Sequence, residues 1–210
     1  MPDISKFISG FKRFQSDWLG PDASLFDKLK KGQSPCTMVI ACSDSRVDPL
    51  FLTNSYPGDL FIVRNVANLV PPCEPDDGRH GVSAALEYAV CYLEVENIIV
   101  MGHSQCGGIK GLMEGICACN DHSFIGNWVG IAQNAKEKVL EDMPETPVEM
   151  QASACERAAI LLSLENLMTF PWVRERVEKG RLALHGWYFD LQAGTLSGYS
   201  ADSRHFEIIS

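Results

Sequence analysis

The chain has 210 residues, of which 46% are hydrophobic, and this length and composition are typical of one folded domain with a full core. Its formal net charge of −9 argues against a nucleic-acid partner, because nucleic-acid binding calls for clustered Lys and Arg. Its apolar runs are far too short to cross a bilayer, so we expect no membrane-spanning segment and no membrane partner.

Two helices are predicted in the first part of the chain. Residues 4–19 place aromatic and aliphatic side chains near helical spacing, which predicts an amphipathic helix. The apolar face of such a helix must be buried against its own domain or against a second subunit. A short second helix is predicted over 24–31, ended by Gly32.

Strands and helices alternate in the rest of the chain. Short apolar runs bounded by turn residues predict strands at 37–41, 60–63, 97–101, 182–190 and 195–199. Helical patterns predict helices at 83–93, 107–113, 123–140, 148–168 and 171–178. Ser83 is expected to cap the helix that it begins. Gly194 forms a turn before the last strand, which should therefore pair with its predecessor as an antiparallel hairpin.

This alternation is typical of an α/β fold with a mainly parallel sheet. We predict a four-stranded, mainly parallel sheet with an added antiparallel edge strand, flanked by helices. The whole chain, 1–210, is expected to be a single domain. Within it, residues 1–32 would form an N-terminal helical arm, and residues 33–210 would form the α/β core.

A split set of cysteine and histidine residues carries the strongest chemical signal. Cys42 opens the pentapeptide C-S-D-S-R, and His103 and Cys106 lie in the segment G-H-S-Q-C-G-G. Two thiolates and one imidazole suit zinc and leave one coordination position open, which distinguishes a catalytic zinc from a structural one. Both segments begin at predicted carboxyl ends of strands, where α/β sheets place their ligand sites, so we expect a single site.

Neighbouring groups could assist a water molecule held at that open position. Asp44 could accept a hydrogen bond from the water, and Arg46 could pair with Asp44 and hold it ionised. Gly107 and Gly108 leave backbone N–H groups exposed at the start of a helix, where an anion or a developing oxyanion would be stabilised.

The eight cysteines bear on the cellular compartment. Because residues 1–18 lack the uninterrupted apolar core of a secretion signal, we expect a reducing, cytoplasmic location. Cysteines in such a compartment bind metals or pack in cores more often than they form disulfides. Cys117 and Cys119 form a C-x-C pair near His122, and the sequence favours ordinary loop residues over a second metal or redox site there.

Several ordered motifs resemble those of the β-class carbonic anhydrases, over a stretch from about Gln33 to Asp190. The motifs are C-S-D-S-R (42–46), R-N-V-A-N (64–68), E-Y-A-V (87–90), G-H-S-Q-C-G-G (102–108) and L-H-G-W-Y-F-D (184–190). The segments N-L-V-P-P and H-S-Q-C-G-G-I-K-G-L look most like the plant-type branch of that family.

The resemblance implies a role for each matching residue. It implies that Cys42, His103 and Cys106 bind one zinc ion per subunit, and that Asp44 and Arg46 form a catalytic dyad. It also implies substrate-cleft positions, at which Gln33 reaches the substrate oxygen, Gly107 offers a backbone contact, and apolar walls come from Phe61, Val66 and Tyr88.

The resemblance further implies the reaction and the assembly. The reaction is the reversible hydration of carbon dioxide to bicarbonate and a proton, by attack of a zinc-bound hydroxide. The smallest unit of the family is a homodimer, and tetramers and octamers are the larger alternatives, with the N-terminal helix embracing the partner subunit. A second branch carries a bicarbonate-responsive pocket that uses a tryptophan and a tyrosine. Here those positions are Val39 and Phe189, so the switch is expected to be absent.

Two other functions compete with carbon dioxide hydration. Some proteins of this fold hydrolyse carbon disulfide or carbonyl sulfide, although the C-S-D-S-R pentapeptide favours carbon dioxide. A non-catalytic protein that binds zinc or bicarbonate is the alternative from another class, and the intact pairing of Asp44 with Arg46 argues against it. A closed zinc site with Asp44 as its fourth ligand is the structural alternative.

Overall fold

The computed structural model describes residues 4–20, 24–74, 78–115 and 123–210. The chain divides into two compact units, Met1–Ser34 and Pro35–Ser210. The first unit contains the two predicted helices, α1 (Ser5–Trp18) and α2 (Ser24–Leu29). The rings of Phe14 and Phe26 meet edge to face with centroids 5.3 Å apart, and this contact packs the two helices together.

The apolar side chains of α1 remain largely exposed. None of its residues is buried, and four large apolar side chains at or next to its first turns are more than half exposed: Ile4, Phe7, Ile8 and Phe11. The predicted helix is therefore confirmed, and its apolar side chains are exposed among the described residues.

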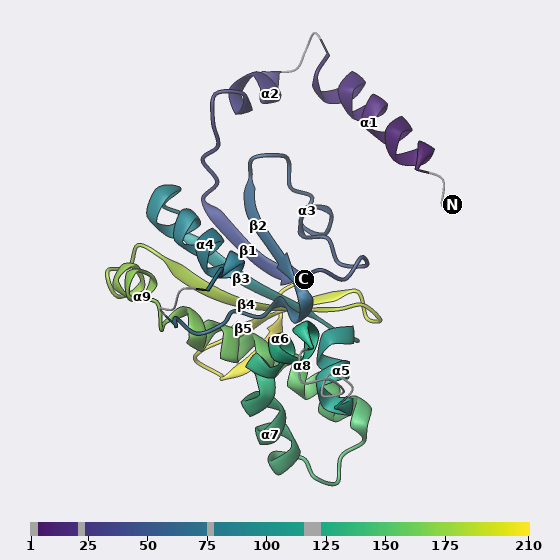
Figure 1. Ribbon diagram of the computed structural model, residues 1–210, viewed down its shortest axis with the longest axis vertical. Helices are drawn as coiled ribbons and strands as arrows, with labels where there is room; N and C mark the ends of the chain where they lie inside the picture. Colours follow the sequence, from purple (N-terminus) through teal and green to yellow (C-terminus); the bar gives the residue numbers. More distant parts are fainter. Residues whose placement is uncertain (1–3, 21–23, 75–77, 116–122) are drawn as a thin grey trace. The chain divides into compact units, whose positions relative to one another are not determined.

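The second unit is built on one mixed sheet of six strands in the order β2-β1-β3-β4-β5-β6 (Figure 1). Its strands are β1 (Thr37–Cys42), β2 (Leu60–Asn65), β3 (Asn97–His103), β4 (Ala183–Asp190), β5 (Thr195–Ser200) and β6 (His205–Ile208). The first four strands pair in parallel, and β5 and β6 are antiparallel additions. The predicted fold class is confirmed.

The sheet departs from the prediction at its far edge and at two strand ends. The edge strand is β6 rather than β5, and the sequence analysis missed it because H-F-E-I (205–208) is too short to show a strand period. Strands β2 and β3 continue to Asn65 and His103, each two residues beyond its predicted end. His103 is therefore the last residue of β3, at the carboxyl end where the site was expected.

Helices cover the sheet and surround its carboxyl end. They are α3 (Pro49–Leu52), α4 (Gly81–Glu87), α5 (Gly107–Glu114), α6 (Phe124–Val129), α7 (Gln133–Asp142), α8 (Val148–Leu167) and α9 (Pro171–Glu178). The predicted helix over 83–93 begins earlier, at Gly81, and Ser83 is not its cap; a π-helical segment, Tyr88–Tyr92, follows it.

The predicted helix over 123–140 is two helices. A 3-10 turn, Gly130–Ala132, separates α6 from α7. Glycine is a weak helix former, so the break falls where the helical conformation is least favoured. Ser123 does begin α6, and its hydroxyl accepts a hydrogen bond from the backbone N–H of Gly126 at 3.0 Å.

Two large apolar clusters, and a smaller third one on β1 and β3, hold the unit together. One cluster joins the sheet to α4, α8 and α9, with residues such as Met38, Leu86 and Val173 fully buried. The other cluster gathers α5, α6, α7 and α8 at one end of the sheet (Figure 1), and it includes Cys42 and Cys106. The second cluster therefore encloses the thiols of the candidate site.

The strand order places that site at a topological switch point. From β1 the chain adds β2 on one side of it and β3 on the other, so the winding direction reverses between β1 and β3. Ligand sites in open α/β sheets lie at the carboxyl ends of strands beside such a reversal. Cys42 ends β1 and His103 ends β3, as the sequence predicted. Within the described residues, no helix is long and apolar enough to cross a membrane.

Candidate metal centre

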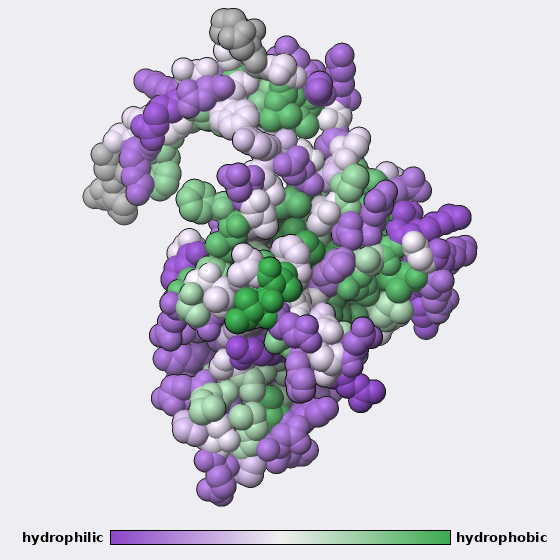
Figure 2. All heavy atoms as spheres, turned by 180° about the vertical axis from the view of Figure 1, so that it is seen from behind, coloured by the Kyte–Doolittle hydropathy of each residue, from purple (hydrophilic) through white to green (hydrophobic). Residues whose placement is uncertain are grey.

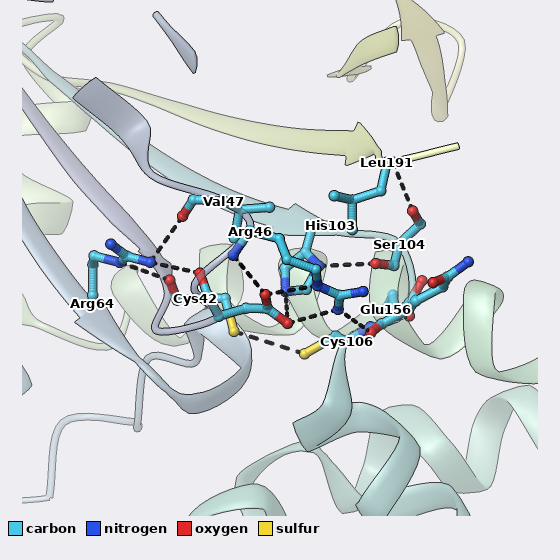
Figure 3. A network of polar contacts seen from close by, with 11 residues as sticks. Cys42, Arg46, Val47, Arg64, His103, Ser104, Cys106, Glu156 and Leu191 are labelled. Atoms are coloured by element: carbon cyan, nitrogen blue, oxygen red, sulfur yellow. Dashed lines mark hydrogen bonds and ion pairs between the residues drawn. The ribbon is translucent and has the colours of Figure 1, made fainter. Parts of the chain in front are cut away.

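Cys42, His103 and Cys106 come together at the carboxyl ends of β1 and β3. Their candidate ligand atoms all lie within 4.8 Å of one another, and the Sγ atoms of the two cysteines are 3.9 Å apart. All three side chains are buried. Figure 3 shows the two sulfur atoms facing each other beside the imidazole. Among the residues that the structure describes, no other group of three or more potential ligands converges in this way.

The imidazole of His103 is oriented for a metal. Its Nδ1 lies 2.9 Å from the carbonyl oxygen of Ser104, which can only accept, so Nδ1 carries the proton and Nε2 keeps a lone pair. That Nε2 is buried and has no hydrogen-bond partner. A buried polar atom without a partner is costly, and a metal ion would satisfy it. Nε2 together with two thiolates is a donor set that fits zinc.

The two thiols influence each other's ionisation. The pKa of Cys42 is lowered well below the usual value, chiefly because the Cys106 thiol donates a hydrogen bond to the Cys42 thiolate. For the same reason, and because of its burial, the pKa of Cys106 is raised. The opposite shifts mean that the first thiolate forms more easily than the second, and a divalent cation would stabilise both as thiolates.

Asp44 and Arg46 form a bidentate ion pair next to this cluster. Arg46 donates from Nε to Oδ1 at 2.9 Å and from Nη2 to Oδ2 at 2.7 Å, and its backbone N–H also donates to Oδ1. These bonds hold the pKa of the Asp44 carboxyl far below its ordinary value. Oδ2 of Asp44 lies 4.0 Å from Nε2 of His103, so the carboxylate faces the convergence point of the three donor atoms.

The second ligand segment is held by contacts that the sequence analysis did not anticipate. Glu156 on α8 is buried, and its carboxylate accepts hydrogen bonds from the backbone N–H of Cys106 at 2.9 Å and from the hydroxyl of Tyr188 at 2.8 Å. Burial raises the pKa of Glu156, and these bonds oppose that shift. A charged residue between the buried Cys155 and Ala159 of an apolar helix face was the available signal.

Arg64 is the other residue to which the sequence analysis assigned no role. It lies on β2, within the R-N-V-A-N motif, and its guanidinium contacts the segment that carries Cys42 and Asp44. An arginine in the partly buried strand L-F-I-V-R-N was the available signal, because a guanidinium there needs acceptors.

The predicted cleft residues are distributed around the unit. Phe61 on β2 and Tyr88 after α4 are in ring contact, with centroids 5.8 Å apart. Val66 follows β2 directly and lies beside the N-terminal end of α5, where Gly107 is the first residue. Gln33 is exposed and belongs to the first unit, so its relation to the cluster stays a prediction.

An open, mainly apolar groove adjoins the carboxyl end of β2. It has a volume of about 1000 Å³, and Val66, Phe124 and Trp128 are among its lining residues. Trp128 donates from Nε1 to the carbonyl oxygen of Val66 at 2.7 Å, which fixes one wall of the groove. The C-x-C pair Cys117 and Cys119 lies outside the described residues.

Comparison with known sequences places this site in context. Residues 37–196 match a family model described as carbonic anhydrase. The chain is 43% identical over 204 residues to beta carbonic anhydrase 3 of Arabidopsis thaliana, covering 96% of this chain and 78% of that protein. It is 43% identical over 181 residues to beta carbonic anhydrase 5, chloroplastic, of the same plant, covering 86% of this chain and 60% of that protein.

Comparison with solved structures points to the same family as the sequence comparison. The fold resembles that of the β-carbonic anhydrase CcaA with a TM-score of 0.91 and 33% identity, covering 99% of this chain and 92% of that chain. A tetrameric β-carbonic anhydrase from the filamentous ascomycete Sordaria macrospora is similar with a TM-score of 0.82 and 26% identity, covering 94% of this chain and 97% of that chain.

Proposed function

The chain belongs to the β-carbonic anhydrase family, and from this membership we propose how its residues carry out the reversible hydration of carbon dioxide to bicarbonate and a proton. The observation that carries the proposal is the partnerless Nε2 of His103, buried within 4.8 Å of two buried cysteine sulfurs. Most buried polar side-chain atoms have a partner, and a metal ion held by the two sulfurs would provide one for this nitrogen.

We assign Cys42, His103 and Cys106 as the zinc ligands. When bound, zinc lowers the pKa of coordinated water toward neutrality and polarises an oxygen of the substrate. The protein's own contribution begins with ligand orientation. The carbonyl oxygen of Ser104 fixes the imidazole of His103, and the Glu156 carboxylate fixes the backbone of Cys106.

Asp44 acts in this proposal as a hydrogen-bond acceptor that is always ionised. Arg46 keeps the pKa of Asp44 low, so the carboxylate stays ionised near neutral pH. It therefore accepts hydrogen bonds and has no proton to donate. A water molecule at the open position beside the three ligands would donate one O–H to Oδ2 of Asp44, which would leave a lone pair of the water free for the carbon of the substrate. Arg46 prevents the carboxylate from turning toward the ligands.

The substrate-cleft assignments come from the family resemblance. We propose that Phe61, Val66 and Tyr88 form apolar walls that suit an uncharged gas, that the backbone N–H of Gly107 contacts the substrate, and that Gln33 reaches its oxygen. The position of Gly107 at the start of α5 supports its part, because N–H groups at a helix start are unpaired and point outward.

Zinc content of single variants tests the ligand assignment. Cys42→Ala and His103→Ala should each reduce bound zinc from one per chain to almost none, because a three-ligand site loses a third of its donors. Cys155→Ala is the matched control, since Cys155 is also fully buried in the same cluster but is not assigned as a ligand. Full zinc content in Cys42→Ala would refute the assignment.

Asp44→Asn tests the role of the dyad. The asparagine keeps the size of the carboxylate but loses its charge and half of its acceptor capacity, so zinc should stay bound while hydration slows by about 10–100-fold. Stopped-flow hydration at pH 8, with zinc measured on the same samples, checks this. Unchanged hydration in Asp44→Asn would remove Asp44 from the mechanism. Carbonyl sulfide and carbon disulfide, assayed in parallel, distinguish the hydrolase alternative.

The assembly and the location are also proposals. We propose a homodimer or a higher homo-oligomer, supported by the exposed apolar face of α1 and by large exposed side chains of the second unit such as Phe51 and Phe124. Figure 2 shows apolar side chains gathered in patches on one face of the molecule, and such patches mark interfaces. A relative from Sordaria macrospora is described as tetrameric. Light scattering distinguishes dimer, tetramer and octamer.

We propose a cytoplasmic location, supported by the cysteine-rich composition. One relative is named chloroplastic, so fractionation of cells into cytosol and plastids is the test. We also propose that residues 1–32 act as an arm and residues 33–210 as the catalytic core of one domain. Deletion of the arm should change the oligomeric state more than it changes zinc binding.

A further inference from the structure

Arg64 makes four hydrogen bonds to residues 42–48, which link β1 to α3. Figure 3 shows its guanidinium facing Cys42 and Val47. Its Nε donates to the carbonyl oxygen of Cys42 at 3.0 Å, and its Nη2 donates to the carbonyl oxygens of Asp44 and Val47 at 2.7 Å and 3.0 Å. Its Nη1 donates to Oδ2 of Asp48 at 2.9 Å. One side chain on a neighbouring strand therefore binds both ends and the middle of residues 42–48.

Beyond the end of β1 at Cys42, one backbone bond continues the pairing with β2, from the N–H of Ser43 to the carbonyl oxygen of Asn65 at 2.8 Å. Residues 45–46 form a turn, and the rest of 43–48 has no regular secondary structure. Three of the segment's carbonyl groups converge on one planar guanidinium, whose fixed fork of donors matches such a set of acceptors. An ammonium donates from a single point and does not span three carbonyls in this way.

The Asp44–Arg46 pair does not by itself place the carboxylate. Its hydrogen bonds join residues only two positions apart, so the pair moves with the segment as one body. Its position relative to His103 depends on contacts with distant parts of the chain. Arg64 supplies four such contacts across 16 to 22 residues. Arg46 adds one bond, from Nη2 to the carbonyl oxygen of Gln105 at 3.0 Å, and the backbone N–H of Ser43 adds one to the carbonyl oxygen of Asn65 at 2.8 Å.

We propose that Arg64 is a positioning residue, which places the Cys42 thiolate and the Asp44 carboxylate against His103 through the backbone of residues 42–48. The inference rests on the proposed function, because it concerns the same site. Arg64 acts through Cys42 and Asp44 and does not itself contact a reacting atom. The Arg64–Asp48 ion pair contributes little to this role, because both side chains are partly exposed to solvent.

The matched variants follow from these contacts. Arg64→Ala removes all four hydrogen bonds. Arg64→Lys keeps the positive charge but loses the planar set of N–H donors. Asp48→Asn removes only the charge partner, since its Oδ1 can still accept from the backbone N–H groups of Leu50 and Phe51. Arg176→Ala removes a guanidinium that pairs with Glu94 away from the metal centre, and controls for the loss of any arginine.

Two readouts other than activity test the proposal. In Arg64→Ala, amide hydrogen exchange should speed up in residues 43–48, with and without zinc, and stay unchanged in the β4–β5 hairpin. Zinc transfer to a chelator should be about 10–100-fold faster, and kcat should fall by a similar factor while KM changes little. Arg64→Lys should lie between Arg64→Ala and the unsubstituted protein, and both controls should behave like the unsubstituted protein.

Several results would overturn the proposal. A folded Arg64→Ala with unchanged exchange in residues 43–48 and unchanged zinc release has no positioning defect, whatever its activity. Faster exchange throughout the chain would show a general loss of stability instead. If Arg64→Ala does not fold, Arg64→Lys carries the same readouts. Failure of the proposed function looks different, because the unsubstituted protein itself would then bind no zinc or hydrate no carbon dioxide.

Discussion

Replacing Gly108 with alanine should destabilise the protein, although alanine is the better helix former. A Cβ atom at Gly108 would lie 2.6 Å from Cγ1 of Val66 and 3.1 Å from Cβ of Ala67. Val66 is β-branched and stiff at χ1, and Ala67 is fully buried in a left-handed conformation with φ of 64°. Neither neighbour can easily move away. The absence of a side chain at Gly108 is therefore what lets α5 pack against the residues that follow β2.

The neighbouring Gly107 gives the matched control, because a Cβ atom there would meet nothing within 4 Å. Gly107→Ala should be neutral or stabilising by up to about 1 kcal/mol from helix propensity. Overpacking typically costs about 1–3 kcal/mol, so the two variants should differ by about that amount.

Urea unfolding at a fixed zinc concentration measures the difference, since bound zinc itself shifts the apparent stability. In a thermal scan each kcal/mol corresponds to about 2–4 °C for a chain of this size. If Gly108→Ala proves as stable as Gly107→Ala, the close packing of α5 against Val66 and Ala67 is not a real constraint, and the reasoning fails.

Three further predictions concern groups around the site. Glu156→Ala removes the partner of the buried Cys106 N–H and leaves the Tyr188 hydroxyl only its 3.4 Å contact with Ser153, so it should lower the free energy of unfolding by roughly 1–3 kcal/mol. Glu156→Gln should lose much less, and equal losses in urea titrations would contradict this. Burial raises the pKa of Cys155 to about 11, so iodoacetamide at pH 8 should modify it only after unfolding, and rapid labelling of the native chain by mass spectrometry would argue otherwise. Two backbone N–H groups lower the pKa of Asp190 below its ordinary value of 3.8. The contribution of Asp190 to stability is therefore complete above pH 3.8 and is lost as the pH falls through the lowered pKa. Asp190→Asn should weaken this acid dependence of stability, and an identical acid unfolding profile would rule the contribution out.

The sequence predicted the parts of the fold that depend on local patterns. The strands that begin at Thr37 and Asn97 are continuous apolar runs, and α9 begins at a proline in its first position, so each has a clear local signal. Strand β6 has no such signal, because its conformation depends on pairing with β5. The start of α4 was placed too late because Ser83 is a good capping residue, yet the helix forms without a side-chain cap.

In the candidate site, too, features with a local sequence signal were predicted and features that depend on distant residues were not. The residue types of Cys42, His103 and Cys106, and their places at strand ends, were enough to predict that they meet. The groups that hold them, Arg64 and Glu156, were not predicted, because their partners are mostly backbone atoms of distant segments. Every residue has a backbone carbonyl and nearly every residue a backbone N–H, so the sequence does not show which of them a distant side chain binds. Such hydrogen bonds are found only in the three-dimensional structure.

The switch point between β1 and β3 also bears on how the protein folds. The two thiols that it brings together are 64 residues apart in the chain, and parallel strands cannot pair without a long crossover. Closing a loop of that length costs conformational entropy before any ligand atom meets another, and such distant pairings form slowly. The donor set therefore assembles only once the central strands have docked. Zinc would then bind after the rate-limiting step of folding, so it should slow unfolding much more than it speeds folding.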